Sequence, residues 1–223
     1  MIAIIAAMNE EVEALTALMT NLNNKDIKGI NFYTGNLNNK EVVVCQSGVG
    51  KVNAAISTTI LIDSFEIEYI INIGSAGSLR NDIRCGSVVI PEVVAHHDCN
   101  VPGWPKGFEG GKRTYYPDNN LISKAKKIAD DKTYFVPLVS GDSFIYLPSQ
   151  TEKILNDYKD AGCCEMEGAS IAQTADFFKV PFIIIRSISD VTIEDGNEMA
   201  FEDFLPIAAK NSAVYCEKFV GLE

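Results

Sequence analysis

Segments rich in apolar, β-branched residues alternate along the chain with segments whose apolar residues recur at helical spacing. The first kind predicts strands at Ile2–Ala7, Asn31–Gly35, Glu41–Gln46, Tyr69–Ile73, Ser87–Ala95, Tyr134–Val139, Cys163–Glu165 and Val180–Ile188. The second kind predicts helices at Glu10–Thr20, Lys51–Ser64, Asn119–Asp130, Gly168–Lys179 and Phe201–Val220. Strands that alternate with helices form a mostly parallel sheet with both faces covered, so the pattern predicts an α/β fold.

The connecting segments carry two further signals. Asn38-Asn39 predicts a turn between two strands. The segment Cys99–Pro117 has no clear period and contains three prolines and several aromatic residues. Such a segment either serves function or an interface, or packs as a surface loop, and the pattern favours neither alternative. The chain shows no repeat, low-complexity tract or linker, so we expect one domain over residues 1–223.

Composition and charge narrow the class of protein. Hydrophobic residues make up 47% of the chain and charged residues 22%, which is typical of a globular domain and excludes disorder and a coiled coil. The net charge of −11 disfavours binding to nucleic acid or to an anionic membrane surface. No apolar run is long enough for a membrane span, and Met1–Ala7 lacks the basic flank of a signal peptide.

The cysteines and histidines suggest neither a disulfide framework nor a metal site. No C-x-x-C pair occurs among the six cysteines, and the two histidines are adjacent, at His96-His97. We therefore expect free thiols in a reducing cytoplasm and no bound metal ion.

Two glycine-rich segments resemble cofactor motifs but fail their spacing. Ser47–Lys51 ends as a phosphate loop does, but Cys45 stands in place of its first glycine and Val52 in place of its hydroxyl residue. Gly74-Ser75-Ala76-Gly77 lacks the dinucleotide spacing, so no nicotinamide or flavin is indicated. Glycines at strand ends nevertheless allow a small ligand to approach the backbone closely.

Three carboxylates follow apolar segments: Glu11, Glu167 and Asp190. Each alone has an ordinary interpretation, because a carboxylate is favoured in the first turn of a helix or as a cap. Strand ends in a parallel sheet meet at one edge, however, so the three side chains are expected in one cleft. Carboxylates with pKa values pushed apart can serve as acid and base in cleaving a glycosidic bond.

Six motifs in this order resemble the 5′-methylthioadenosine/S-adenosylhomocysteine nucleosidases of the nucleoside phosphorylase superfamily. They are Met8-Asn9-Glu10-Glu11-Val12, Ser47-Gly48-Val49-Gly50-Lys51-Val52, Asn72-Ile73-Gly74-Ser75-Ala76-Gly77, Ser140-Gly141-Asp142-Ser143-Phe144, Glu165-Met166-Glu167 and Arg186-Ser187-Ile188-Ser189-Asp190. The resemblance implies a single α/β domain with a central twisted mixed sheet flanked by helices, working as a homodimer. It also implies hydrolysis of thio-substituted adenosines to adenine and a thioribose, as in methionine salvage, without metal or organic cofactor.

The resemblance assigns the bond-breaking groups. Asp190 matches the general acid that protonates adenine N7, and Ser189 is expected to orient it. Glu11 matches the carboxylate that activates water, and Arg186 and Ser75 match the groups that place this water.

The same resemblance assigns the binding groups. Glu167 matches the glutamate that binds the ribose hydroxyls, and Met166 the residue packed on the ribose. Phe144 is expected to stack on adenine, whose edge the backbone of Ile145 contacts. The alkylthio slot is expected to contain Met8, Val49 and Phe201, with Val101 and Trp104 completing it from a second subunit.

Two other functions remain open. A phosphorylase would need cationic ligands for phosphate, yet Asn72 stands where bacterial purine phosphorylases have arginine, and Asn9-Glu10-Glu11 is acidic. A non-catalytic nucleoside sensor would keep Phe144 and Glu167 but lose Glu11 or Asp190, and both are present. The chain departs from the family at Asn9, within 99–117, and by one extra residue between Asp190 and Phe201, so the pocket for the 5′-substituent is the least defined.

Overall fold

The computed structural model describes residues 1–109, 113–193 and 197–222, with the backbone alone at 197–200. Its helices are α1 (Asn9–Thr16), α2 (Lys51–Ser64), α3 (Asn119–Lys126), α4 (Pro148–Asp157), α5 (Gly168–Phe178) and α6 (Asn197–Gly221). Its strands are β1 (Ile2–Ala6), β2 (Thr20–Ile27), β3 (Ile30–Leu37), β4 (Lys40–Gln46), β5 (Tyr69–Ser78), β6 (Val88–Val89), β7 (Val94–His96), β8 (Thr114–Tyr115), β9 (Thr133–Tyr134), β10 (Leu138–Ser140), β11 (Cys163–Glu165) and β12 (Phe182–Val191). No helix of these ranges is both long and apolar enough to cross a membrane.

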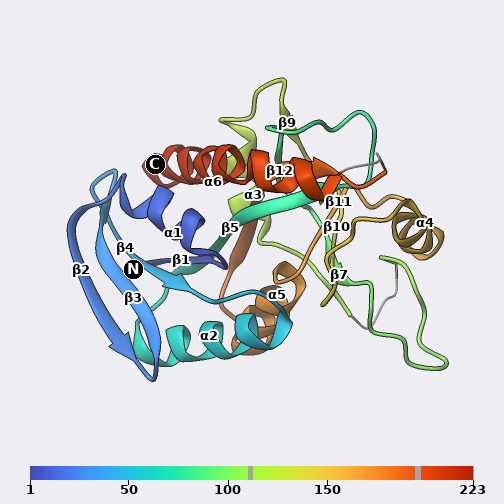
Figure 1. The fold of residues 1–223 in the computed structure, drawn as a ribbon. Coiled ribbons are helices and arrows are strands. Elements are labelled where there is room, and N and C mark those ends of the chain that lie inside the picture. Colours follow the sequence, from blue (N-terminus) through green and yellow to red (C-terminus); the bar gives the residue numbers. More distant parts are fainter. Residues whose placement is uncertain (110–112, 194–196, 223) are drawn as a thin grey trace.

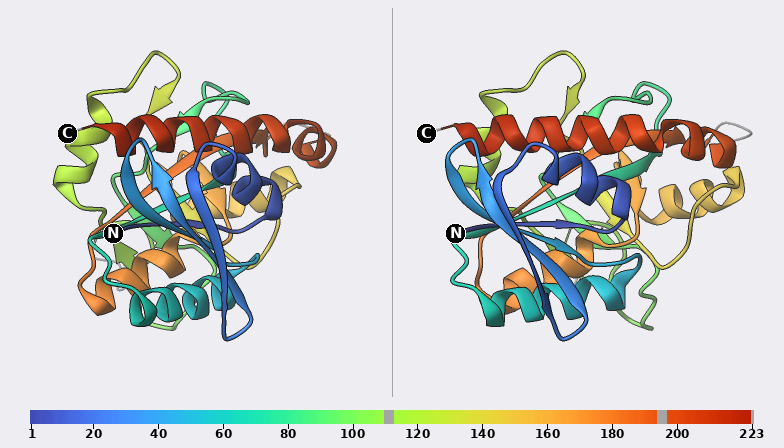
Figure 2. Two further views of the ribbon diagram at one scale, coloured as in Figure 1. Left: turned by 90° about the vertical axis from the view of Figure 1, so that its left-hand side faces the viewer. Right: turned by 60° about the vertical axis from the view of Figure 1, so that its left-hand side comes forward.

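The strands form one mixed sheet, in the order β2-β3-β4-β1-β5-β11-β10-β7-β8, with β12 on the other edge of β5 and β6 and β9 beyond it. Helices α1, α3 and α6 cover one face of the sheet, and α2 and α5 cover the other (Figure 1; Figure 2). The structure thus has the mixed sheet between helices that the family resemblance implied. The alternation predicted a mostly parallel sheet, and six pairings of the described strands are parallel. The pairs β2–β3, β3–β4, β5–β11, β6–β12 and β7–β8 are antiparallel, which makes the sheet mixed.

The central strands are apolar throughout because each contributes to two hydrophobic cores. In β1, Ile2 and Ile4 pack into the core under α1 and α6, whereas Ala3 and Ile5 pack into the core above α2 and α5. Successive side chains of a strand point to opposite faces, so a strand covered on both sides needs apolar residues at every position.

Strand β5 organises the opening in the sheet. Along one edge, β1 pairs with β5 up to Asn72, and β11 pairs with it only at Gly77 and Ser78. Residues 73–76 of β5 therefore face the space between the ends of β1 and β11. Along the other edge, β12 pairs with β5 from Ile70 to Ser78.

Helix α2 and the Asn38-Asn39 turn are confirmed, the turn having positive φ angles of 47° and 62°. Two predicted strands are each divided in two, at Pro91 and Pro137, because proline has no N–H for a sheet ladder. The helix predicted to Thr20 ends at Thr16, and β2 follows. Strand β5 continues through the predicted loop Gly74–Gly77 because β12 pairs with it there.

Candidate active site

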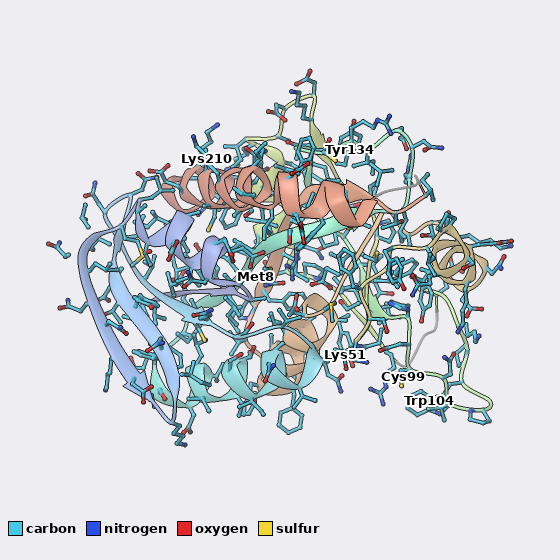
Figure 3. The ribbon with its side chains drawn as sticks, viewed as in Figure 1. Met8, Lys51, Cys99, Trp104, Tyr134 and Lys210 are labelled. Atoms are coloured by element: carbon cyan, nitrogen blue, oxygen red, sulfur yellow. The ribbon has the colours of Figure 1, made fainter. Side chains whose placement is uncertain are left out.

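A cavity of about 310 Å³ lies at the opening between β1 and β11. It is lined by Ala7, Met8, Glu11, Val49, Ser75, Ala76, Gly77, Ser143, Phe144, Ile145, Cys164, Glu165, Met166, Glu167, Arg186, Ser189, Asp190 and Phe201. Met8 lies near the centre of the molecule in Figure 3. The cavity thus brings together Glu11, Glu167 and Asp190, three carboxylates that are far apart in the sequence.

The carboxylate of Glu11 is fixed by hydrogen bonds from the segment after β1 and from Ser75 inside β5. Its Oε2 accepts from the backbone N–H groups of Ala7 (3.0 Å) and Met8 (3.1 Å), directly after β1. Its Oε1 accepts from the N–H of Ser75 (3.0 Å) and its hydroxyl (3.4 Å) on β5. Glu11 is buried, so these donors replace the water that would otherwise solvate the carboxylate.

Arg186 is the largest fully buried side chain of the described core and lies among acceptors. Its guanidinium forms an ion pair with Glu165 and lies 3.6 Å from Glu167 Oε2. It also donates to Asn72 Oδ1 (2.7 Å) and to the Ser75 carbonyl (3.3 Å). A buried guanidinium is stable only when paired in this way, so Arg186 is already neutralised by the protein.

Glu165 connects this ion pair to α5. Its Oε2 accepts from the N–H groups of Glu167 (3.1 Å) and Gly168 (2.7 Å), where α5 begins. Its Oε1 accepts from the Ser140 hydroxyl, whose oxygen accepts from the Ala169 N–H (2.8 Å). The carboxylate therefore satisfies N–H groups at the helix N-terminus while it faces Arg186.

Glu167 is a buried carboxyl group whose pKa is raised above its ordinary value. Its Oε1 accepts from the Gly50 N–H (2.9 Å). Burial raises the pKa of Glu167, as do Glu165 and Glu11, whereas Arg186 and the Gly50 N–H lower it, with a net result of about 7. At neutral pH, this group is therefore close to equilibrium between its protonated and ionised forms.

Asp190 is oriented by an irregularity in β12. The register between β5 and β12 shifts between Ile188 and Asp190, and a bulge of this kind re-aims the side chains around it. Asp190 is buried, and its Oδ1 accepts from the Ser189 hydroxyl (2.8 Å). A Cβ at Gly77 would lie 3.0 Å from Asp190 Oδ2, so the glycine leaves room for the carboxyl group.

One wall of the cavity is aromatic and partly exposed. Phe144 meets Phe201 edge to face, with ring centroids 5.2 Å apart, and Tyr146 stacks at 6.4 Å on Phe144. Met166 and Ile145 continue the apolar lining. The cavity lining thus combines ionisable and apolar side chains, as a site for an amphiphilic small molecule requires.

Val101 and Trp104 do not line this cavity. They line a separate hollow of about 410 Å³, in which Arg113 lies over the Trp104 ring at 5.3 Å from its centroid. Trp104 lies at the periphery of the molecule, far from Met8 in the view of Figure 3.

Glu165 has no role predicted from the motifs, and the structure places it in the ion pair with Arg186. A signal existed, since an arginine inside an apolar strand needs a buried counter-ion. Gly74 was predicted only as part of a loop, yet a Cβ there would lie 2.1 Å from Arg186 Nη1. In the described ranges, His, Cys, Asp and Glu side chains form no group of three that could hold a metal ion.

We expect Glu167→Gln to gain stability relative to wild type as the pH rises from 5 to 8. The pKa of Glu167 lies at about 7 in the folded chain, against an ordinary value of 4.5, so the folded state binds this proton more tightly than the unfolded state. The contribution of this group to the free energy of unfolding is therefore lost as the pH rises through this interval. Glutamine avoids that loss, which is on the order of 2 kcal/mol.

Urea unfolding of the ligand-free protein at pH 5 and pH 8 measures this difference. Glu152→Gln, at an exposed position of α4, is the matched control and should show no such trend. A Glu167→Gln difference that is the same at both pH values would contradict the raised pKa.

The chain matches the model of the phosphorylase superfamily over residues 1–221. A 5′-methylthioadenosine/S-adenosylhomocysteine nucleosidase of Psychromonas ingrahamii is 40% identical over 229 residues, covering 99% of this chain and 98% of the relative. The structure of the Streptococcus pneumoniae nucleosidase of that name, with a transition-state inhibitor, superposes with a TM-score of 0.93 at 31% identity, covering 99% and 98% of the two chains.

A futalosine hydrolase of Helicobacter pylori is also similar, with a TM-score of 0.89 and 28% identity over 98% of this chain and 96% of the other. This fold therefore carries more than one nucleoside hydrolase. The identity over almost the whole of both chains is higher for the Psychromonas relative. The chain belongs to the phosphorylase superfamily and, within it, to the 5′-methylthioadenosine/S-adenosylhomocysteine nucleosidase family.

Proposed function

We propose that this chain hydrolyses the N-glycosidic bond of 5′-methylthioadenosine and S-adenosylhomocysteine, releasing adenine and the thioribose. The observation that carries the proposal is the cavity, which combines four carboxyl groups with one arginine and an apolar wall. Such an excess of carboxyl groups suits a reaction in which positive charge develops on the sugar. The proposal agrees with the names of the similar proteins.

Water is favoured over phosphate as the attacking group. Phosphate needs cationic ligands, and Arg186 is the one arginine or lysine among the described residues that line the cavity. Its guanidinium already pairs with Glu165 and contacts Asn72. Bringing a phosphate dianion among the carboxylates would cost several kcal/mol, because charges repel strongly at low effective dielectric.

In the proposed mechanism, Asp190 donates a proton to adenine N7, so that neutral adenine leaves. Ser189, whose hydroxyl donates to Asp190, orients this carboxyl group. Glu11 activates the attacking water, which Ser75 and Arg186 help to place. The contacts of Glu11 with Ser75 support this role, since they fix a carboxylate at the cavity wall.

The sugar is held on the opposite side by Glu167 and Met166. In its ionised form, Glu167 accepts hydrogen bonds from the ribose hydroxyls and stabilises positive charge on the ring. Because the pKa of Glu167 in the free protein is about 7, kcat/KM should rise with pH through this region.

The base and the 5′-substituent occupy the apolar part of the cavity. Phe144 stacks on adenine, and the backbone of Ile145 contacts its edge. Met8, Val49 and Phe201 surround the alkylthio group. All three residues line the cavity, which supports this assignment.

We further propose that the active form is a homodimer in the cytoplasm. Val101 and Trp104 line a hollow separate from their own chain's cavity, so only a second copy would use them to complete the alkylthio slot. The paired helices α2 and α5 expose an apolar surface that a second copy would cover, with Val52 68% and Phe177 77% exposed. The proposed reaction requires no metal or organic cofactor.

Product analysis with 5′-methylthioadenosine tests the reaction. We expect adenine and free methylthioribose, at a rate that added phosphate does not increase, because the cavity lacks an available cation. Chromatography of the products with and without phosphate measures both. Formation of a ribose 1-phosphate would indicate a phosphorylase, and intact substrate would indicate a sensor. A panel of other 5′-substituted adenosines, including aminodeoxyfutalosine, then ranks substrates.

Asp190→Asn should lower turnover by about 10² to 10⁴, because an amide cannot donate the proton to N7. The amide oxygen can still accept from Ser189, so the fold and the binding of adenine should persist. Adenine release and adenine binding by calorimetry measure the two effects. Asp203→Asn, at an exposed position of α6, is the control. Turnover near the wild-type rate would exclude Asp190 as the general acid.

Phe177→Asp should convert the dimer to monomers and reduce turnover, because it places a charge on the apolar face of α2 and α5. Phe177 is mostly exposed in the single chain, so the fold itself should persist. Sedimentation at micromolar concentration measures the assembly. Leu22→Asp, on the exposed strand β2, is the control and should leave the dimer intact. A wild-type chain that sediments as a monomer while fully active would exclude the dimer.

A further inference from the structure

A cluster of one lysine and two aspartates lies outside the cavity, at the N-terminal end of α2. Lys51 Nζ lies 2.6 and 2.7 Å from the two carboxylate oxygens of Asp98. Asp98 Oδ2 accepts from the Asp142 N–H (2.9 Å), and Asp142 Oδ1 accepts from the Lys51 N–H (2.8 Å). The three residues thus close a ring of hydrogen bonds that includes two backbone amides. Figure 3 shows Lys51 at this end of α2.

The ring connects segments that form different parts of the cavity wall. On one side, Lys51 follows Val49, which lines the cavity, and Gly50, whose N–H donates to Glu167. On the other side, Asp142 precedes the lining residues 143–145. Asp98 follows β7 and lines no part of the cavity, but it bonds to both sides.

We propose that Lys51 and Asp98 are positioning residues that hold the Gly50 N–H on Glu167 and so set the fraction of Glu167 that is ionised. This inference rests on the proposed role of Glu167 in binding the sugar. Neither Lys51 nor Asp98 lines the cavity, so both act through Gly50.

The geometry argues against an ordinary surface ion pair. Both oxygens of Asp98 contact Lys51, and the two side chains are only 22% and 30% exposed. Although burial opposes it, the hydrogen bonds from Lys51 and from the Asp142 N–H hold the pKa of Asp98 below its ordinary value. Gly50 has a φ angle of 96°, so this segment relies on neighbouring groups to hold its shape.

The consequence for Glu167 follows from the groups that face it. Glu165 on β11 and Glu11 on α1 disfavour its ionisation, whereas Arg186 on β12 and the Gly50 N–H favour it. Loss of the Gly50 hydrogen bond should therefore raise the pKa of Glu167. The rise of kcat/KM with pH would then occur at higher pH, with little loss at alkaline pH.

The test compares pH profiles of kcat/KM for wild type, Lys51→Met and Asp98→Ala. We expect the pH at which kcat/KM rises to be higher in both variants by about half a pH unit or more. This shift is equivalent to at least ~3-fold lower kcat/KM at pH 6. Lys51→Arg should restore most of the wild-type profile. Lys126→Met removes a 2.6 Å ion pair with Glu92 elsewhere on the surface and should leave the profile unchanged.

The two variants also separate positioning from a direct effect of charge. Removing the lysine charge would raise the pKa of Glu167 through space, but removing the aspartate charge would lower it. Shifts in opposite directions, or no shift in either variant, would overturn the proposal. A shift that accompanies dissociation of the assembly in sedimentation would also overturn it. Failure of the proposed function is distinguishable, because wild type itself would then release no adenine.

Discussion

The pairing of the buried Arg186 guanidinium with carboxylates is the interaction on which the site depends. A guanidinium inside an apolar sheet needs polar partners. Glu165 forms an ion pair with it, Asn72 and the Ser75 carbonyl accept hydrogen bonds from it, and Glu167 lies 3.6 Å away. These groups come from β5, β11 and the start of α5, so the cation joins separate segments at one point. The Arg186 side chain also requires a glycine at position 74, because its guanidinium leaves no room there for a Cβ.

The sheet provides the space for this pairing through an interruption on one edge of β5. The pairing of β1 with β5 stops at Asn72, and the pairing of β11 with β5 begins at Gly77. Polar side chains at and near these strand ends can therefore gather in the gap, inside an otherwise apolar fold. Glu11 then follows β1, Glu165 ends β11, and Asp190 lies near the end of β12. The bulge in β12 shows that regular pairing alone does not produce this arrangement.

The sequence predicted those parts that depend on local pattern or on motifs. The helix Lys51–Ser64 and the Asn38-Asn39 turn were predicted because spacing and turn chemistry are local properties. Strand β2 was missed because its residues are polar and exposed, and only pairing with β3 makes it a strand. Helix α4 and strand β8 were missed as well, because α4 buries only Thr151 and Ile154 and β8 has two half-buried residues.

The site shows the same division between local and long-range information. The three separated carboxylates were identified from their positions after apolar segments, and the structure brings them into one cavity. The role of Glu165 was not identified, because it depends on contacts with Ser140 and Arg186 that no local pattern contains.

The pKa of Glu167 also depends on such contacts. In water, a glutamate carboxyl group is ionised at neutral pH. Buried at this position without Arg186, the same group would remain protonated. Its intermediate value requires burial, two neighbouring glutamates, one arginine and one backbone amide together. The pKa of Glu167 therefore results from tertiary contacts that act in opposite directions. A small displacement of any one of these contacts would change that pKa.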